Sequence, residues 1–271
     1  MRSSREEACT TTSSLCGQLG ASRVLLKLDL TRAFDSISCP LLFDVLSNYG
    51  FGTRFLGWLA ILLSSASTKV IMNGEPGPPI WHRQGLRQGD PMSPQLFVLT
   101  MDTLGRLLRR ATELRILQQL HPRRPIPVVS LYADDVILFC HPTQGDTMAV
   151  KGVLQLFGRA SGLQVNFLKS SATLICCDAD DMAPIIAALG CPIVDLPITY
   201  LGIPLSIKRP SAALLQPVVD KTAGMLPTWK ACLMNKAGRL AFVKAVLSAI
   251  PIHQLLVLAP PKRIIKALEK I

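Results

Sequence analysis

The apolar residues of this 271-residue chain fall into two kinds of run. Short runs rich in β-branched and other large apolar residues predict buried strands at 24–30, 128–131, 136–139 and 173–177. Longer stretches with an apolar residue every three or four positions predict helices at 40–49, 53–63, 94–110 and 147–161. Strands and helices therefore follow one another without a regular repeat.

Turn residues add a hairpin to this order. Residues 69–73 predict a strand, 74–79 are rich in Gly and Pro and predict a turn, and a second strand reaches Arg83. Because the elements do not alternate as strand, helix and strand, the pattern favours an α+β fold with an antiparallel sheet over a doubly wound parallel sheet.

The last quarter of the chain has a different pattern. From Ser211 onward it is helical, with 212–225 and 236–250 each spaced for one buried face. We therefore expect a loose N-terminal segment, an α+β domain and a helical segment, with bounds of 1–20, 21–207 and 208–271.

Two adjacent carboxylates, Asp134 and Asp135, interrupt the second pair of predicted strands. Their position predicts that they lie at the tip or first rung of a hairpin. Neighbouring carboxylates repel each other, and a chain that keeps both beside buried strands usually offers them a cation such as Mg²⁺. The alternative is an ordinary turn, since Asp is a common turn residue.

A third carboxylate, Asp29, stands near the end of the predicted strand 24–30. A lone Asp on an apolar strand costs free energy unless it is paired or binds a metal ion. Three carboxylates on two neighbouring strands would match the donor set that two-metal phosphoryl transfer requires.

Five blocks of residues share an order and spacing that resemble one known family. The blocks are 27–35, 84–94, 132–135, 161–170 and 200–205. In this order they resemble the palm of non-LTR (LINE-type) retrotransposon reverse transcriptases, in particular those of plant elements. The similarity continues through 226–230 and 237–239, so it extends from about residue 20 to the C-terminus.

The resemblance implies a right-hand polymerase palm with partial fingers over 21–207 and a thumb-like helical segment over 208–271. It implies RNA-directed DNA polymerase activity, with an RNA template, a DNA primer and dNTPs as partners. Asp29, Asp134 and Asp135 would be the catalytic residues and would hold Mg²⁺ or Mn²⁺.

Nucleotide-binding residues are also implied by the resemblance. Phe34 lies where the family places a bulky side chain beneath the sugar of the incoming nucleotide, where it would clash with a 2′-hydroxyl. Gln88 and Gly89, with Arg87, belong to a loop that touches nucleotide and template, and Lys169 would be a general acid for pyrophosphate. The alternatives are a core aromatic for Phe34, a capped helix after Gly89 and a solvated Lys169.

The charge of the chain agrees with a polynucleotide partner. Lys and Arg number 29 and Asp and Glu 18, a formal net charge of +11. Arginines are concentrated after the second block, where Arg106, Arg109 and Arg110 are expected to contact nucleic acid together with Arg87. Such runs are also typical of solvated faces, which remains the alternative.

The eight cysteines lack the paired spacing of a zinc site and favour buried thiols in a reducing, intracellular compartment. The family resemblance implies the nucleus. The apolar stretch 240–260 is interrupted by Lys244, Pro251 and His253, so we expect no membrane span.

Parts of the family pattern are missing. Nothing in 1–22 resembles the basic fingers region that the family places ahead of Asp29, so the chain resembles a fragment of a longer polyprotein. Three hypotheses follow: a reverse transcriptase palm, a catalytically incomplete remnant that at most binds nucleic acid, and an ordinary α+β domain whose acidic hairpin is only a turn.

Overall fold

The chain folds into two compact units. The structure, a computed structural model, describes residues 22–121, 128–177, 179–206, 211–225, 232–258 and 260–270. One unit comprises 22–194 and the other the described residues from Asp195 onward, and each has a hydrophobic core of its own. The predicted segment 1–20 and the predicted boundary at residue 207 lie outside the described residues.

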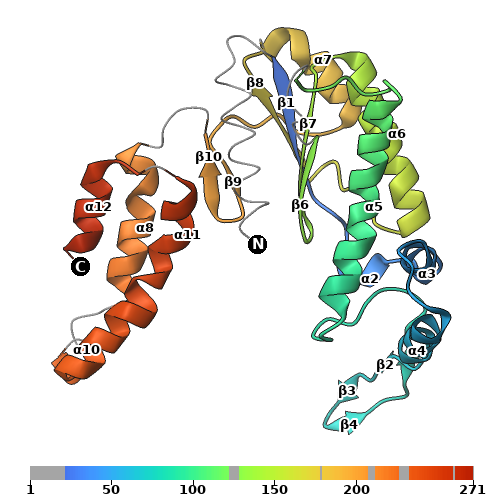
Figure 1. Ribbon diagram of the computed structural model, residues 1–271, viewed down its shortest axis with the longest axis horizontal. Coiled ribbons are helices and arrows are strands. Elements are labelled where there is room, and N and C mark those ends of the chain that lie inside the picture. Colours follow the sequence, from blue (N-terminus) through green and yellow to red (C-terminus); the bar gives the residue numbers. More distant parts are fainter. Residues whose placement is uncertain are drawn as a thin grey trace. The chain divides into compact units, whose positions relative to one another are not determined.

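A four-stranded antiparallel sheet forms the centre of the first unit (Figure 1). Its strands, in spatial order, are β6 (Val129–Tyr132), β7 (Asp135–Cys140), β1 (Arg23–Leu28) and β8 (Ser171–Ile175). β8 ends two residues before the predicted 177, because Cys176 has a φ of 53° and leaves the extended conformation. The antiparallel sheet expected from the sequence is confirmed.

Helices accompany the sheet in this unit. They are α2 (Ala33–Ser36), α3 (Cys39–Asn48), α4 (Thr53–Ser64), α5 (Ser93–Glu113), α6 (Gln144–Ser161) and α7 (Ala179–Leu189). α6 begins three residues before the predicted Thr147, because the Thr143 side chain caps it by accepting a hydrogen bond of 3.2 Å from the Asp146 N–H. The sequence pattern did not predict α7, which has Pro184 inside it.

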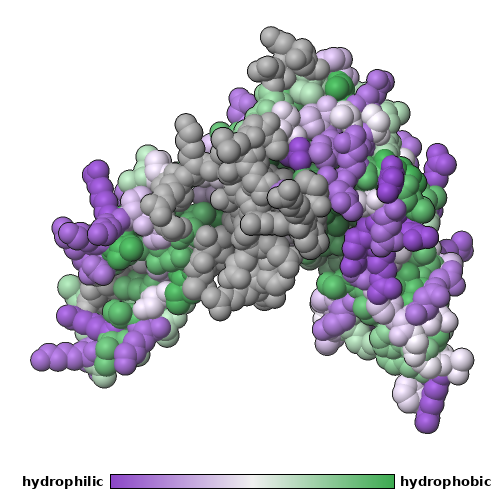
Figure 2. Space-filling view, turned by 45° about the horizontal axis from the view of Figure 1, so that its top comes forward, coloured by the Kyte–Doolittle hydropathy of each residue, from purple (hydrophilic) through white to green (hydrophobic). Residues whose placement is uncertain are grey.

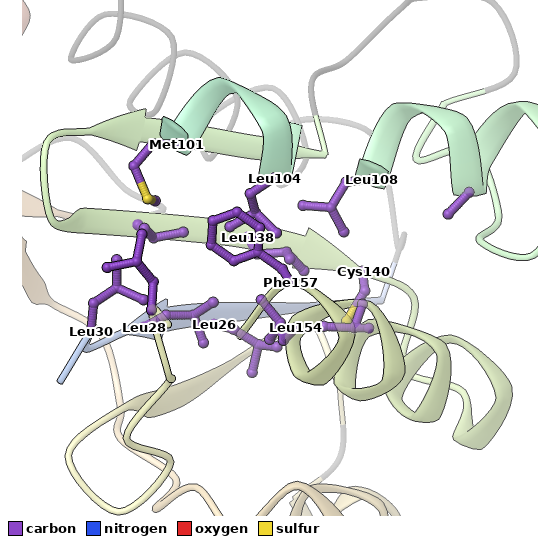
Figure 3. Packing of buried hydrophobic residues seen from close by; sticks show 14 of the residues in the cluster. Leu26, Leu28, Leu30, Met101, Leu104, Leu108, Leu138, Cys140, Leu154 and Phe157 are labelled. Carbon is purple, nitrogen blue, oxygen red and sulfur yellow. The ribbon is translucent and has the colours of Figure 1, made fainter. Parts of the chain in front are cut away.

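The core of this unit lies between the sheet and two of these helices. Side chains two positions apart on a strand share a face. Figure 3 accordingly shows apolar side chains of β1 and β7 packed with those of α5 and α6, among them Leu26, Leu28, Leu138, Met101, Leu104, Leu154 and Phe157. The central strands are thus fixed by apolar packing along their length.

The predicted hairpin after α4 is built from two short ladders. The strands β2 (Ser67–Thr68) and β5 (Ile80–Trp81) pair, as do β3 (Ile71–Met72) and β4 (Glu75–Pro76). The turn predicted for 74–79 is wrong: it lies at Asn73 and Gly74, whose φ values of 52° and 87° suit a tight hairpin. Two hydrophobic side chains of this hairpin, Ile71 and Trp81, are 70% and 60% exposed. Figure 2 shows that hydrophobic residues also occur among hydrophilic ones on the surface in general.

The second unit combines one hairpin with helices. Its elements are β9 (Ile198–Tyr200), β10 (Ile203–Leu205), α8 (Ala212–Gly224), α10 (Lys236–Phe242), the π-helical segment η1 (Val243–Leu247), α11 (Ala249–Val257) and α12 (Lys262–Glu269). Leu215 and Val219 of α8 pack against Ile264 of α12.

The helix predicted for 236–250 is wrong in its end and its regularity. Helical structure continues to Val257, because Pro251 falls in the first turn of α11, where its missing N–H is tolerated. The Ser248 N–H donates to the Val243 carbonyl five residues earlier at 3.0 Å, the π-helical pattern. No helix in the described part of the chain is long and apolar enough to cross a membrane.

Candidate active site

The two adjacent carboxylates lie where the sequence predicted, at the tip of the β6–β7 hairpin. Tyr132 pairs with Asp135, which leaves Ala133 and Asp134 as the loop. Ala133 has a φ of 52°, in the left-handed region that tight hairpin loops use. Asp134 is exposed and Asp135, on the first rung, is half-buried.

The third carboxylate belongs to the neighbouring strand. Leu28, the last residue of β1, pairs with Val136 of β7. The next residues outward are Asp29, directly after β1, and Asp135, the first residue of β7, so both carboxylates lie at the same end of the sheet. Asp29 is exposed. The fold therefore places Asp29, Asp134 and Asp135 at the same end of the sheet, from segments more than 100 residues apart in sequence.

The surroundings of Asp135 disfavour its charged form. Burial raises the pKa of the Asp135 carboxyl, the negative charge of Asp134 raises that pKa further, and Lys27 on β1 opposes the shift. A cation placed beside the two carboxylates would stabilise the charged form of Asp135 against both burial and the charge of Asp134.

The donor set is compatible with magnesium in part. Within the described residues, no group of three or more His, Cys, Asp or Glu side chains is arranged to hold a metal ion. Mg²⁺, however, commonly takes one or two carboxylates and completes its shell with water and substrate phosphates. The hard oxygen donors of Asp29 and Asp135 fit an ion shared with a phosphate-bearing substrate.

The turn that follows α6 fixes the backbone around Asp29. The Asn166 N–H donates to the Asp29 carbonyl at 2.8 Å, and the Asp29 N–H donates to the Ser170 hydroxyl at 3.0 Å. Lys169 is exposed on this turn, and its N–H donates to the Asn166 carbonyl at 3.2 Å. The structure thus connects the backbone of Lys169 to the end of β1 through two turn residues whose positioning contacts sequence reasoning missed.

Two glycines hold the short helix α2, which carries Phe34. Gly85 has a φ of 82°, and a Cβ there would lie 2.6 Å from the Asp35 carbonyl oxygen. Gly162 has a φ of 80°, and its Cβ would lie 2.0 Å from the Ser36 carbonyl oxygen. No other residue type fits such close backbone approaches without movement. The α2 segment is therefore enclosed by the second and fourth sequence blocks.

Phe34 is half-buried and stacks on a second aromatic ring. Its ring centroid lies 4.5 Å from that of Phe97 on α5, with 18° between the ring planes. Phe97 is fully buried in the core. Phe34 is accordingly a partly buried aromatic residue anchored to the core, which is compatible with both interpretations drawn from the sequence.

The glutamine-glycine loop precedes α5 at the surface. Arg87, Gln88 and Gly89 are all exposed, and Gly89 has a φ of 90°. The Asp90 carboxylate accepts a hydrogen bond of 2.9 Å from the Met92 N–H, which stabilises the turn in front of the helix. The loop thus presents its polar groups to solvent.

The three arginines expected to contact nucleic acid lie exposed on α5, but each has an acidic partner. Arg106 and Arg109 approach Asp102 at 2.8 and 3.5 Å, and Arg110 pairs with Glu113 at 2.9 Å. Asp102 also accepts a hydrogen bond from the Tyr49 hydroxyl. Desolvation acts to raise the pKa of Asp102, but its hydrogen bonds to Tyr49 and Arg106 outweigh it and lower that pKa. These pairings reduce the positive charge that the run presents.

An antiparallel sheet with three carboxylates at one end of two neighbouring strands is the arrangement expected of a polymerase palm. The comparison with protein families agrees with it: residues 2–205 match the family described as reverse transcriptase (RNA-dependent DNA polymerase). The chain belongs to this family. The match begins at residue 2, earlier than the motifs indicated.

Similar proteins come from retrotransposable elements. The chain is 28% identical over 255 residues to the 149 kDa protein of transposon TX1 from Xenopus laevis, covering 93% of this chain and 19% of that protein. It is 29% identical over 142 residues to the retrovirus-related Pol polyprotein of the type-2 element R2DM of Drosophila melanogaster, covering 52% of this chain and 13% of that one. The chain therefore spans less than a fifth of either relative.

Among solved structures, the chain is similar to the telomerase of Candida albicans in complex with a fragment of telomeric RNA. The alignment covers 98% of this chain and 43% of the telomerase chain. The TM-score is 0.45 and the sequence identity is 14%.

Proposed function

We propose that this chain is the catalytic palm of an RNA-directed DNA polymerase that extends a DNA primer on an RNA template. The observation that carries the proposal is the position of Asp29, Asp134 and Asp135 at one end of two paired strands. Membership of the reverse transcriptase family and similarity to proteins of non-LTR elements support it.

The carboxylates have the central role in this proposal. Asp29 and Asp135, with Asp134 beside them, would hold Mg²⁺ or Mn²⁺ through their oxygens. A bound divalent ion would supply stabilisation of the charge that develops as the primer 3′-hydroxyl attacks the α-phosphate. Before an ion binds, the raised pKa of Asp135 makes its neutral form more populated than that of an ordinary Asp.

The remaining residues would position the nucleotide and the strands. Phe34, held against Phe97, would exclude a 2′-hydroxyl and favour deoxynucleotides. Gln88 and Gly89 would contact the incoming nucleotide, and Lys169 would give a proton to the departing pyrophosphate. The exposed arginines would lie along phosphates of the template or primer, namely Arg87, Arg106, Arg109 and Arg110.

Primer extension tests the proposal directly. We expect the purified 271-residue chain to extend a DNA primer annealed to RNA when Mg²⁺ and dNTPs are present. Asp134→Asn should reduce incorporation to background, because it removes a charged oxygen donor at the hairpin tip. Asp195→Asn, a substitution outside the three carboxylates, is the control. Activity that survives Asp134→Asn would contradict the proposed site.

A second candidate is a domain that binds nucleic acid without extending it, which the net charge of +11 and the exposed arginines favour. Salt-sensitive binding of RNA by a folded chain that shows no extension would support it. We also propose a nuclear location, which rests on the family resemblance alone. The position of a fluorescent fusion in cells would test it.

A further inference from the structure

The backbone of Asp29, whose carboxylate belongs to the proposed metal site, has no paired residue in the four-stranded sheet. The paired residues of β1 end at Leu28. Beyond this point the strand is continued by contacts to 164–166: Leu30 forms a bridge with Val165, and the Thr31 N–H donates to the Gln164 carbonyl at 2.9 Å. The direction of the Asp29 side chain therefore depends on the turn that follows α6.

That turn takes both polar backbone groups of Asp29. The Asp29 carbonyl accepts from the Asn166 N–H at 2.8 Å, a contact between backbone atoms. The Asp29 N–H donates to the Ser170 hydroxyl at 3.0 Å. The first contact survives any side-chain substitution, whereas the second depends on one hydroxyl group.

The Ser170 hydroxyl is fixed in its own position. It donates to the Asn166 carbonyl at 2.7 Å, and Ser170 is only 1% exposed. A hydroxyl that donates to one backbone and accepts from another has both of its main hydrogen-bonding roles used. Ser170 thus connects the turn to Asp29 in a place that water does not readily reach.

We propose that Ser170 is a positioning residue that aims the Asp29 carboxylate for divalent-cation binding. The proposal rests on the proposed function in taking Asp29 as a metal ligand. Groups that hydrogen-bond to metal-binding residues typically change metal affinity by about 10- to 100-fold when removed. Ser170 acts on the backbone of Asp29 rather than on its carboxylate, so we expect the lower end of that range.

Lys169 is held by the same turn. Its N–H donates to the Asn166 carbonyl, and the Asn166 side-chain oxygen lies 3.3 Å from the same N–H. Through Ser170 and Asn166 the turn therefore joins the backbone of the proposed metal ligand to the backbone of the proposed general acid.

The test measures Mn²⁺ binding, by electron paramagnetic resonance of the free ion, to the full chain and its variants. Asp29→Asn should remove the Mn²⁺ binding that depends on the Asp29 carboxylate. Ser170→Ala should weaken this same binding by about 10-fold, because Asp29 loses the group that orients its backbone. Ser170→Thr keeps the hydroxyl and should restore affinity. Should the alanine variant fail to fold, Ser170→Cys, whose thiol hydrogen-bonds weakly, replaces it with the same expectation.

Thr100→Val is the matched control. Thr100 is fully buried, and its hydroxyl donates to the Leu96 carbonyl within α5 at 3.0 Å. Thr100→Val loses one buried hydroxyl hydrogen bond, whereas Ser170→Ala loses two. Thr100→Val should therefore lower the melting temperature without changing Mn²⁺ affinity, which separates loss of stability from loss of positioning.

The outcomes separate this inference from the proposed function. Equal Mn²⁺ affinities for Ser170→Ala and the unsubstituted chain would overturn the positioning role, as would a chain whose Mn²⁺ binding is indifferent to Asp29→Asn. Weakened Mn²⁺ binding in Ser170→Ala, with no primer extension by any variant, would support the positioning role and count against the polymerase.

Discussion

At the scale of single residues, Thr173 on β8 is an unusual buried group. It is 1% exposed, and its hydroxyl has no hydrogen-bond partner within the part of the chain that the structure describes. Burying a hydroxyl without a partner costs roughly 1–3 kcal/mol. We expect Thr173→Val, which keeps the shape of the side chain, to increase the free energy of unfolding by about 1 kcal/mol in urea denaturation.

Thr100→Val is the appropriate comparison for this substitution too. The Thr100 hydroxyl has a partner in the Leu96 carbonyl, so the same chemical change there should lower the free energy of unfolding. A decrease for Thr173→Val of the same size would show that its hydroxyl is satisfied in solution.

The sequence allowed the location of the three carboxylates at strand ends to be predicted, because each lies beside an apolar run that forms a strand. Their catalytic role stays a prediction. The positioning role of Ser170 could not be predicted in this way. Its partner Asp29 lies 141 positions away, and a serine in a turn is ordinary. The stacking of Phe34 on Phe97 likewise depends on the packing of α5 against α2, which no local pattern specifies.

At the scale of elements, the contact of the α6 C-terminus with the α2 segment leaves no room for a side chain at Gly162. Gly162 ends α6 in a left-handed conformation, and a Cβ would lie 2.0 Å from the Ser36 carbonyl oxygen. We expect Gly162→Ala to lower the free energy of unfolding by about 2–4 kcal/mol, from backbone strain and the forced shift of α2. Thermal unfolding followed by circular dichroism measures this.

Gly152 is the matched control within the same helix. It lies in the interior of α6, and a Cβ added there would have no neighbour within 4 Å, so Gly152→Ala should raise stability by about 0.5–1 kcal/mol. If both alanines had the same effect, the contact between α6 and α2 would not be close in solution.

Helix positions could be predicted from the sequence where periodicity and turn residues agree. The helices expected at 40–49 and 53–63 match α3 and α4 to within one residue at each end. The prediction of α6 began too late because the cap at Thr143 precedes the periodic residues, and α7 was missed although it contains apolar positions. A cap adds residues ahead of the periodic stretch, and a proline inside a helix suggests a break in it, so the apolar spacing alone does not locate either helix.

At the scale of the whole molecule, two acidic groups have opposite pKa shifts and therefore opposite effects on how stability changes with pH. The pKa of Asp102 is lowered, so its contribution to stability is lost as the pH falls through that lowered value. The pKa of Asp135 is raised by burial and by Asp134, so the folded chain binds more protons there than the unfolded chain does. Asp135 therefore makes folding less favourable as the pH rises through its ordinary range and above.

This sign leads to a prediction for Asp135→Asn in the presence of a chelator. The substitution removes the charge that folding disfavours, so the variant should have the higher melting temperature at pH 7, and the difference should shrink as the pH falls below the ordinary pKa of about 4 for an Asp side chain. Melting temperatures of both proteins across this range test it. Excess Mg²⁺ should reduce or reverse the difference, because only the unsubstituted carboxylate gains a cation. A variant less stable than the parent at pH 7 without metal would mean that Lys27 outweighs burial and Asp134.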